Sequence, residues 1–260
     1  MSTLAPLLAG KRRWVERHMN TTISVGGDLD DSVAQALFAS ISNDEARFSR
    51  FRPDSELAQL AVGDLEFDRA SADLRHLLML CDNLRVATEG WFEYEPRRRS
   101  SDPTDPILDP NAFAKGWIVG RAARVARVAG ARNLVINAGG DVVVDAIDPT
   151  LPACRVGIRH PENPNAVAAV LGIRHGAVAT SGTYERGDHI RGHRGATASV
   201  TVIGPDLGIA DALSTAVFAT GLGTRIPAWW TTFEQSYSLI VIDSEMRLAA
   251  TEPAARMIIT

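Results

Sequence analysis

The chain has 260 residues, of which 45% are apolar and 22% charged, and its formal net charge is −4. This composition is typical of a soluble globular protein with a sizeable core, and the weak negative charge argues against nonspecific binding to nucleic acid. Two cysteines far apart in sequence exclude a disulfide framework or a cysteine metal cluster. No apolar run is long enough to cross a membrane, and the N-terminal segment lacks the basic start of a signal peptide, so we expect a cytoplasmic protein.

A strand and three helices are predicted in the first half. Residues 21–27, "TTISVGG", are typical of a strand, and residues 28–51 and 70–90 have helical apolar spacing, with Gly90 as the expected end of the second helix. Residues 91–110 have the Pro, Asp, Ser and Arg content of a loop. A third helix is predicted over residues 112–130. Its expected buried face is Trp117, Ile118, Val125 and Val128, and its expected solvated face is Arg121, Arg124 and Arg127.

The second half is mostly strand-like. The strand-like segments are residues 133–146, 154–160, 166–182, 198–204 and 238–251, and one helix is predicted over residues 209–221. "NAGGD" (137–141) and "DSEM" (243–246) are typical of turns between antiparallel strands. Strands in runs, with the helices in separate blocks, indicate an α+β fold with mostly antiparallel strands and helices packed around them. "AWWTTF" (228–233) is either a partner surface or, more commonly for tryptophan, part of the core.

Four short segments have residues suited to chemistry. In "DALST", Asp211 and Thr215 lie four apart on one helix face and offer hard oxygen ligands for Mg²⁺ or Ca²⁺, although such an isolated pair is more often a plain surface feature. In "DPNAFAKG", Lys115 near a helix start suits a phosphate, whereas Asp109 can equally be a simple cap.

The other two segments are also ambiguous by themselves. The paired glycines of "NAGGD" either let a ligand approach the backbone or form a hairpin turn. "TSGTYERGDHIRGHRG" (180–195) offers Thr180, Ser181, His189 and His193, and histidine is the commonest general base, but a polar surface loop would have the same composition.

Taken in chain order, these segments resemble successive motifs of the ApbE-like FAD:protein FMN transferases. The matching segments are "DPNAFAKGWIVGRAA", "NLVINAGGDVVV", "AVATSGTYERGDHI" and "SVTVIGPDLGIADALSTAVFATG". Upstream, "MNTTISV" (19–25) and "SRFRPDSELAQL" (49–60) are similar to two further family motifs. The resemblance extends to the C-terminal hairpin and implies one T-fold-related domain over residues 19–260, after an N-terminal extension over residues 1–18.

The resemblance also implies an activity and a set of site residues. Family members bind FAD and Mg²⁺ and transfer the FMN half of FAD to a threonine hydroxyl of an acceptor protein, releasing AMP. The implied metal ligands are the carbonyl of Ala112 with Asp211 and Thr215, and the implied general base is His189. The residues expected to bind FAD are Met19, Phe51, Asp109, Lys115, Ser181 and Ser214.

Two departures from the family pattern leave alternatives open. The segment between "WFEYEP" and "DPNAFAKG" is short, and "HIRGHRG" (189–195) replaces the Ile/Val and Asp-Pro-x-Thr-Gly element of the family. A hydrolase that cleaves FAD to FMN and AMP, or a flavin-binding protein without catalysis, would also be consistent with these residues. The sequence names neither the acceptor protein nor the oligomeric state.

Overall fold

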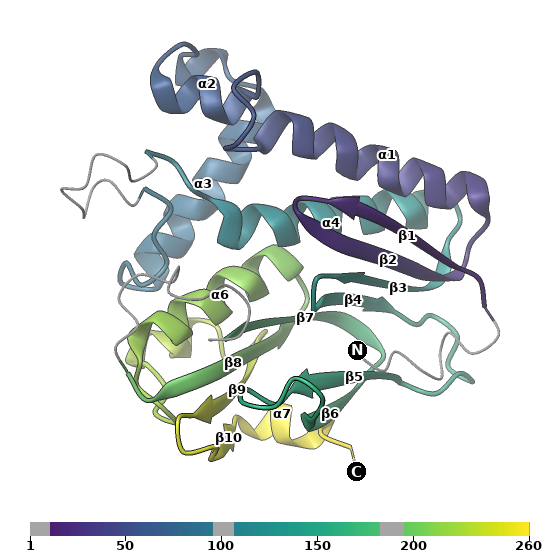
Figure 1. Cartoon of the computed structure of the whole chain (residues 1–260), viewed down its shortest axis with the longest axis vertical. Coiled ribbons are helices and arrows are strands. Elements are labelled where there is room, and N and C mark those ends of the chain that lie inside the picture. The colour runs from purple at the N-terminus through teal and green to yellow at the C-terminus, as the bar shows by residue number, and fades with distance from the viewer. Residues whose placement is uncertain (1–10, 96–106, 183–194, 260) are drawn as a thin grey trace.

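The computed structural model describes residues 11–95, 107–182 and 195–259, which fold around one large sheet (Figure 1). Neighbouring strands run antiparallel throughout this sheet. In spatial order the strands are β1 (Arg13–His18), β2 (Thr21–Asp28), β3 (Arg132–Ala138), β4 (Asp141–Asp145), β7 (His175–Gly182), β8 (Thr197–Gly204), β9 (Ser238–Asp243) and β10 (Leu248–Ala250). A separate antiparallel hairpin contains β5 (Cys154–Arg159) and β6 (Val167–Ile173). The predicted α+β class is confirmed.

Helices cover one face of the sheet, and the β5–β6 hairpin with the last helix covers the other (Figure 1). The helices are α1 (Asp31–Phe48), α2 (Glu56–Val62), α3 (Ala72–Ala87), α4 (Asn111–Val128), α6 (Leu207–Thr220) and α7 (Glu252–Met257). In the described part of the chain, short 3₁₀ helices also span Phe67–Arg69 and Ala228–Thr232. The three long predicted helices and the helix ending before Gly221 are therefore confirmed, with small shifts at their ends.

The central strands of the sheet are buried on both faces, which gives the molecule two cores. In β3, Leu134 and Ile136 face the helices, whereas Val135 between them faces the β5–β6 hairpin, as the alternation of side chains along a strand requires. Cys81 belongs to the first core and Cys154 to the second, so the two thiols are far apart and both are free. Strands covered on both sides are apolar at nearly every position, which explains the continuous apolar runs of the second half.

The segment predicted over residues 166–182 is two strands rather than one. The chain leaves β6 of the hairpin and enters β7 of the large sheet around Arg174. The Arg174 guanidinium donates hydrogen bonds to the carbonyls of Leu151 and Asp148, at 2.7 and 3.0 Å. Two adjacent apolar strands without a Gly-Pro or Asn-Gly turn between them give no sequence signal for this change of sheet.

The predicted faces of the helix over residues 112–130 are partly wrong. Trp117 and Ile118 are buried, but Val125 is 37% and Val128 91% exposed. Arg121, expected in solvent, lies against two carboxylates of α1 and α3. The buried stripe of α4 also contains small residues, Ala122, Ala123 and Ala126, because the helix packs against both α1 and α6. Apolar periodicity gives alanine little weight and therefore misplaced the stripe.

β1 (Arg13–His18) pairs along its whole length with β2. Residues 13–18 are therefore part of the large sheet, although the expected domain begins at residue 19.

Trp229 and Trp230 are buried in the helix-side core. The core alternative for "AWWTTF" is therefore confirmed, and the partner-surface alternative is wrong.

Candidate active site

Antiparallel pairing brings three separated segments to one end of the large sheet. Ile23 pairs with Ala138, and Val142 pairs with Val178, so the turns at 19–20 and 139–140 and the end of β7 lie at the same end. The turn at Gly139 packs tightly, since a Cβ there would lie 2.3 Å from the Thr21 hydroxyl oxygen, and its φ is +69°. Glycine is required at this position because a side chain would collide and the backbone is left-handed.

Helices α4 and α6 cross closely above this end of the sheet. At Gly116 a Cβ would lie 2.6 Å from the carbonyl oxygen of Leu207, the first residue of α6. At Gly208 a Cβ would lie 3.0 Å from the backbone nitrogen of Trp117. The absence of side chains at both glycines lets the helix backbones touch. Lys115, next to Gly116, is thereby placed within reach of side chains on α6.

A lysine between two buried carboxylates is the centre of the candidate site. The Lys115 ammonium makes an ion pair with the carboxylate of Asp141 and lies 3.6 Å from Oδ2 of Asp211. Asp141 and Asp211 are 2% and 6% exposed. The other oxygen of Asp141 accepts a hydrogen bond of 3.2 Å from the backbone N–H of Thr180 in β7. Burying a carboxylate costs free energy unless a partner compensates its charge, and here the fold buries two carboxylates together with the Lys115 ammonium.

Three hydroxyl groups lie beside these charges. The Ser181 hydroxyl is 2.8 Å from the Ser214 hydroxyl and 3.2 Å from the Thr215 hydroxyl. Ser214 also donates to the backbone carbonyl of Asp211, at 2.9 Å, and its side chain is fully buried. These contacts join the end of β7 to the middle of α6. Ser214, fixed by its hydrogen bond to the Asp211 carbonyl, can therefore orient the Ser181 hydroxyl.

Asp109 and Phe51 form a second group, ahead of the first turn of α4. The Asp109 carboxylate accepts a hydrogen bond from the backbone N–H of Asn111, at 3.4 Å, and lies 3.3 Å from Nε of Arg50. The Arg50 guanidinium carbon is 4.1 Å from the centre of the Phe51 ring. Phe51 is 62% exposed, so its ring is accessible from solvent.

Met19 occupies the turn between β1 and β2. Met19 and Asn20 both have positive φ, at 50° and 57°, as a two-residue hairpin turn requires. The Met19 backbone N–H donates to Glu45 of α1 at 2.8 Å, and the same carboxylate lies 3.3 Å from Nδ1 of His18. Glu45 therefore holds this turn against α1, with the Met19 side chain packed on the helix-side core.

The structure brings half of the expected site residues into one cluster. Lys115, Ser181, Asp211, Ser214 and Thr215 form one cluster, and Ala112 precedes Lys115 by one turn of α4. The contacts above place Phe51 and Asp109 in a second group and Met19 at the sheet end. His189 lies outside the described residues, as do most of the residues of the "HIRGHRG" segment.

Sequence reasoning missed two residues, Asp141 and Arg50. Asp141 had a signal, since it follows the paired glycines of "NAGGD" at the start of an otherwise apolar strand. Arg50 had none, because an arginine in a polar loop is ordinary and only the fold places it against Asp109.

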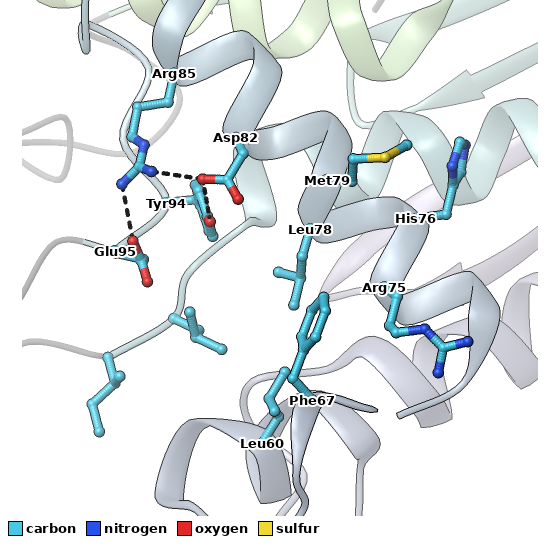
Figure 2. Close-up of a pocket in the computed structure, with 12 residues that line it drawn as sticks. Leu60, Phe67, Arg75, His76, Leu78, Met79, Asp82, Arg85, Tyr94 and Glu95 are labelled. Carbon is cyan, nitrogen blue, oxygen red and sulfur yellow. Dashed lines mark hydrogen bonds and ion pairs between the residues drawn. The ribbon is translucent and has the colours of Figure 1, made fainter. Parts of the chain in front are cut away.

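A separate cavity of about 870 Å³ lies along α3 (Figure 2). Its apolar side includes Leu78 and Met79, and at its polar end Asp82 accepts hydrogen bonds from Arg85 and the Tyr94 hydroxyl, at 2.6 and 2.8 Å. Burial, together with that hydrogen bond, raises the pKa of the Tyr94 phenol. Its described lining residues include none of the cluster around Lys115, and these polar groups already pair with one another.

Two features are absent from the described residues. Within residues 11–95, 107–182 and 195–259 no group of three or more His, Cys, Asp or Glu side chains is arranged to hold a metal ion. In the same ranges no helix combines the length and apolarity needed to cross a bilayer.

Two solved structures share the fold of this chain. The ApbE protein of Thermotoga maritima superposes with a TM-score of 0.77 at 19% sequence identity, over 96% of this chain and 100% of that one. The flavin transferase ApbE of Vibrio cholerae gives a TM-score of 0.75 at 18% identity, over 95% and 99% of the two chains. At these identities the likeness establishes a shared fold.

Comparison of sequences identifies the family. A FAD:protein FMN transferase of Rhodobacter capsulatus is 37% identical over 137 residues, in a match that covers 47% of this chain and 26% of that protein. The match thus spans about a quarter of that relative. The model of the ApbE family matches residues 93–238, which is more than half of the chain and contains the whole cluster around Lys115. The chain therefore belongs to the ApbE family.

Proposed function

We propose that this chain transfers the FMN half of FAD to a threonine hydroxyl of an acceptor protein and releases AMP. The observation that carries the proposal is Lys115 held between buried Asp141 and Asp211, beside the hydroxyls of Ser181 and Thr215, in a chain of the ApbE family. The name of the Rhodobacter capsulatus relative, FAD:protein FMN transferase, supports the same reaction.

The proposed reaction is a displacement at phosphorus. The threonine oxygen of the acceptor attacks the phosphorus of the FMN half, and the bond from that phosphorus to the bridging oxygen breaks. The bridging oxygen leaves with AMP, and the threonine proton passes to a base, for which His189 stays the prediction. The Lys115 ammonium, only 14% exposed, is placed to offset diphosphate charge in a partly desolvated site.

The cluster has a donor set that suits Mg²⁺. Asp211 and Asp141 offer carboxylate oxygens, Thr215 offers a hydroxyl and Ala112 a backbone carbonyl, and Mg²⁺ prefers such hard oxygen ligands. The two carboxylates and the Lys115 ammonium together have one negative charge, which favours an added cation. Asp211, Thr215 and the Ala112 carbonyl would hold the ion. When bound, it would neutralise charge on the diphosphate.

The second group supplies contacts for the planar rings of FAD. The exposed ring of Phe51 is suited to stacking, and Asp109, just before α4, is ion-paired with the arginine that contacts this ring. Met19 stands at the sheet end on the turn that Glu45 holds. Ser181, oriented by Ser214, would hydrogen-bond the ligand near Thr215.

AMP release from FAD tests the proposal. We expect AMP only when Mg²⁺ and an acceptor fragment bearing the target threonine are both present, together with flavin fluorescence on the acceptor after denaturing electrophoresis. Asp211→Asn should abolish both signals because it removes a charge without changing the side-chain volume. Asp82→Asn, in the cavity along α3, is the matched control and should react like the wild type.

Other results would overturn the proposal. AMP release at the same rate without acceptor would show a hydrolase instead. Tight FAD binding with no AMP under any of these conditions would show a flavin-binding protein without catalysis.

A further inference from the structure

Arg50 lies between two residues of the proposed FAD site. Its guanidinium carbon is 4.1 Å from the Phe51 ring centre, and its Nε is 3.3 Å from Oδ1 of Asp109. Phe51 belongs to the loop after α1, whereas Asp109 stands just before α4, so these two residues come from distant parts of the chain. The Arg50 side chain is the contact that joins them.

The backbone around Phe51 is held in place, but its ring is not held by burial. The Ser55 hydroxyl donates to the carbonyl of Ser49 at 2.6 Å, and the Phe51 N–H donates to the Ser49 hydroxyl at 3.3 Å. Phe51 as a residue is 62% exposed. A guanidinium stacked on one face restricts the ring and leaves the opposite face for a planar ligand.

Asp109 is anchored on its other side by the backbone. Its N–H donates to the carbonyl of Tyr94 at 2.7 Å, and its carboxylate accepts from Asn111. The ion pair with Arg50 therefore ties a loop to a fixed point at the start of α4. Groups held before a ligand arrives cost less conformational entropy on binding.

We propose that Arg50 is a positioning residue of the FAD site, which acts on ligand affinity through the Phe51 ring. The inference rests on the proposed function, because it takes FAD as the ligand. It adds a residue outside the set expected from sequence. Lysine could not replace Arg50, since an ammonium lacks the planar surface that stacks on an aromatic ring.

FAD affinity, measured by quenching of flavin fluorescence, tests the inference in a double-mutant cycle. Arg50→Gln should weaken FAD binding about 3- to 10-fold, the range of a partly exposed cation–π contact, and Arg50→Lys should not restore it. In the Phe51→Ala background, adding Arg50→Gln should change the affinity by less than about 2-fold. Arg52→Gln is the matched control, because Arg52 lies in the same loop but pairs with exposed Asp54; it should bind FAD like the wild type.

The outcomes separate this inference from the proposed function. Equal weakening in both backgrounds would show that Arg50 acts independently of Phe51, and wild-type affinity in Arg50→Gln would show no role; either result overturns the inference. Equal loss in Arg52→Gln would show a general effect of loop charge and would also overturn it. If the wild-type chain itself fails to bind FAD, the proposed function fails first.

Discussion

At the scale of single residues, the two lysines of the chain have opposite surroundings. Lys115 is 14% exposed and contacts two buried carboxylates, whereas Lys11 is 24% exposed and pairs with Asp28, whose side chain is 46% exposed. Breaking a buried ion pair leaves an uncompensated charge, but breaking a surface pair costs little. The two lysines thus make a natural pair of test and control.

Replacing Lys115 by methionine should destabilise the fold in a way that Mg²⁺ reverses. Lys115→Met removes the cation that pairs with buried Asp141 and lies beside buried Asp211, which should lower the free energy of unfolding by roughly 3 kcal/mol. A divalent cation held by Asp211, Thr215 and the Ala112 carbonyl would add positive charge to the same cluster and should recover much of this loss. Thermal unfolding with EDTA and with Mg²⁺ measures both effects.

Lys11→Met is the control for Lys115→Met. It should change the free energy of unfolding by less than about 1 kcal/mol and should show no added response to Mg²⁺. Two results would contradict the claim that Lys115 offsets the charge of Asp141 and Asp211. One is an unfolding temperature of Lys115→Met equal to that of the wild type. The other is a rise with Mg²⁺ no larger than the rise in the wild type.

At the scale of elements, the contact between α4 and α6 sets the position of the site. Lys115 is on α4 and Asp211 on α6, and they meet because Gly116 lets the helices touch at Leu207. A side chain at Gly116 meets backbone atoms, which cannot rotate away, so the helices must separate.

Gly116→Ala should therefore damage both stability and ligand binding. Overpacking of this kind costs about 1–3 kcal/mol in unfolding free energy, and the shift should weaken FAD binding by moving Lys115 away from Asp211. Gly120→Ala is the control on the same helix, because nothing lies within 4 Å of its added Cβ; helix propensity predicts a gain of about 0.5–1 kcal/mol. Urea unfolding of the two variants measures the difference, and equal effects would contradict the crossing geometry.

A second inter-helix contact joins α1, α3 and α4 through Arg121. Its Nε donates to Asp44 at 2.9 Å, and its two terminal nitrogens donate to both oxygens of Asp73, at 3.0 and 3.1 Å. Burial raises the pKa of Asp44 above its usual value although Arg121 opposes this, whereas the hydrogen bond from Arg121 lowers the pKa of Asp73.

Arg121→Met should cost roughly 3 kcal/mol near neutral pH, and less in acid. Without the guanidinium the folded-state pKa of Asp44 rises further above its unfolded value, so the folded variant takes up a proton as pH falls and regains stability. Asp73 contributes little to this change, because its lowered pKa stabilises the fold at every pH above its unfolded value and its contribution is lost only in stronger acid. Urea unfolding at pH 7.5 and pH 5 should show that the difference in unfolding free energy between the wild type and Arg121→Met is smaller at pH 5. An equal or larger difference at pH 5 would contradict the role given to Asp44.

At the scale of the whole molecule, sequence patterns predicted the secondary structure correctly for long elements that bury a clear set of apolar residues. They predicted the long helices, the hairpin turns at "NAGGD" and "DSEM" and the antiparallel α+β class. They missed β1, an edge strand whose residues are mostly exposed and show no apolar alternation, and they missed α2 and α7, which are only about two turns long.

The candidate site was predictable only where its residues lie close together in sequence. Asp211 and Thr215 lie on one helix, so their spacing alone put them together. Asp141 and Lys115 come from different elements, and only strand pairing and the Gly116 crossing bring them into contact. Arg50 and Asp109 are likewise joined by tertiary structure alone, which no local pattern encodes.

The most direct test of the account is the mass of the acceptor after reaction. The purified chain, FAD, Mg²⁺ and an acceptor fragment should give an acceptor heavier by one FMN on a threonine, together with an equal amount of AMP. The same mixture with Asp211→Asn should give neither product. An acceptor of unchanged mass beside FAD that stays intact and bound would contradict the central claim that the cluster around Lys115 transfers FMN.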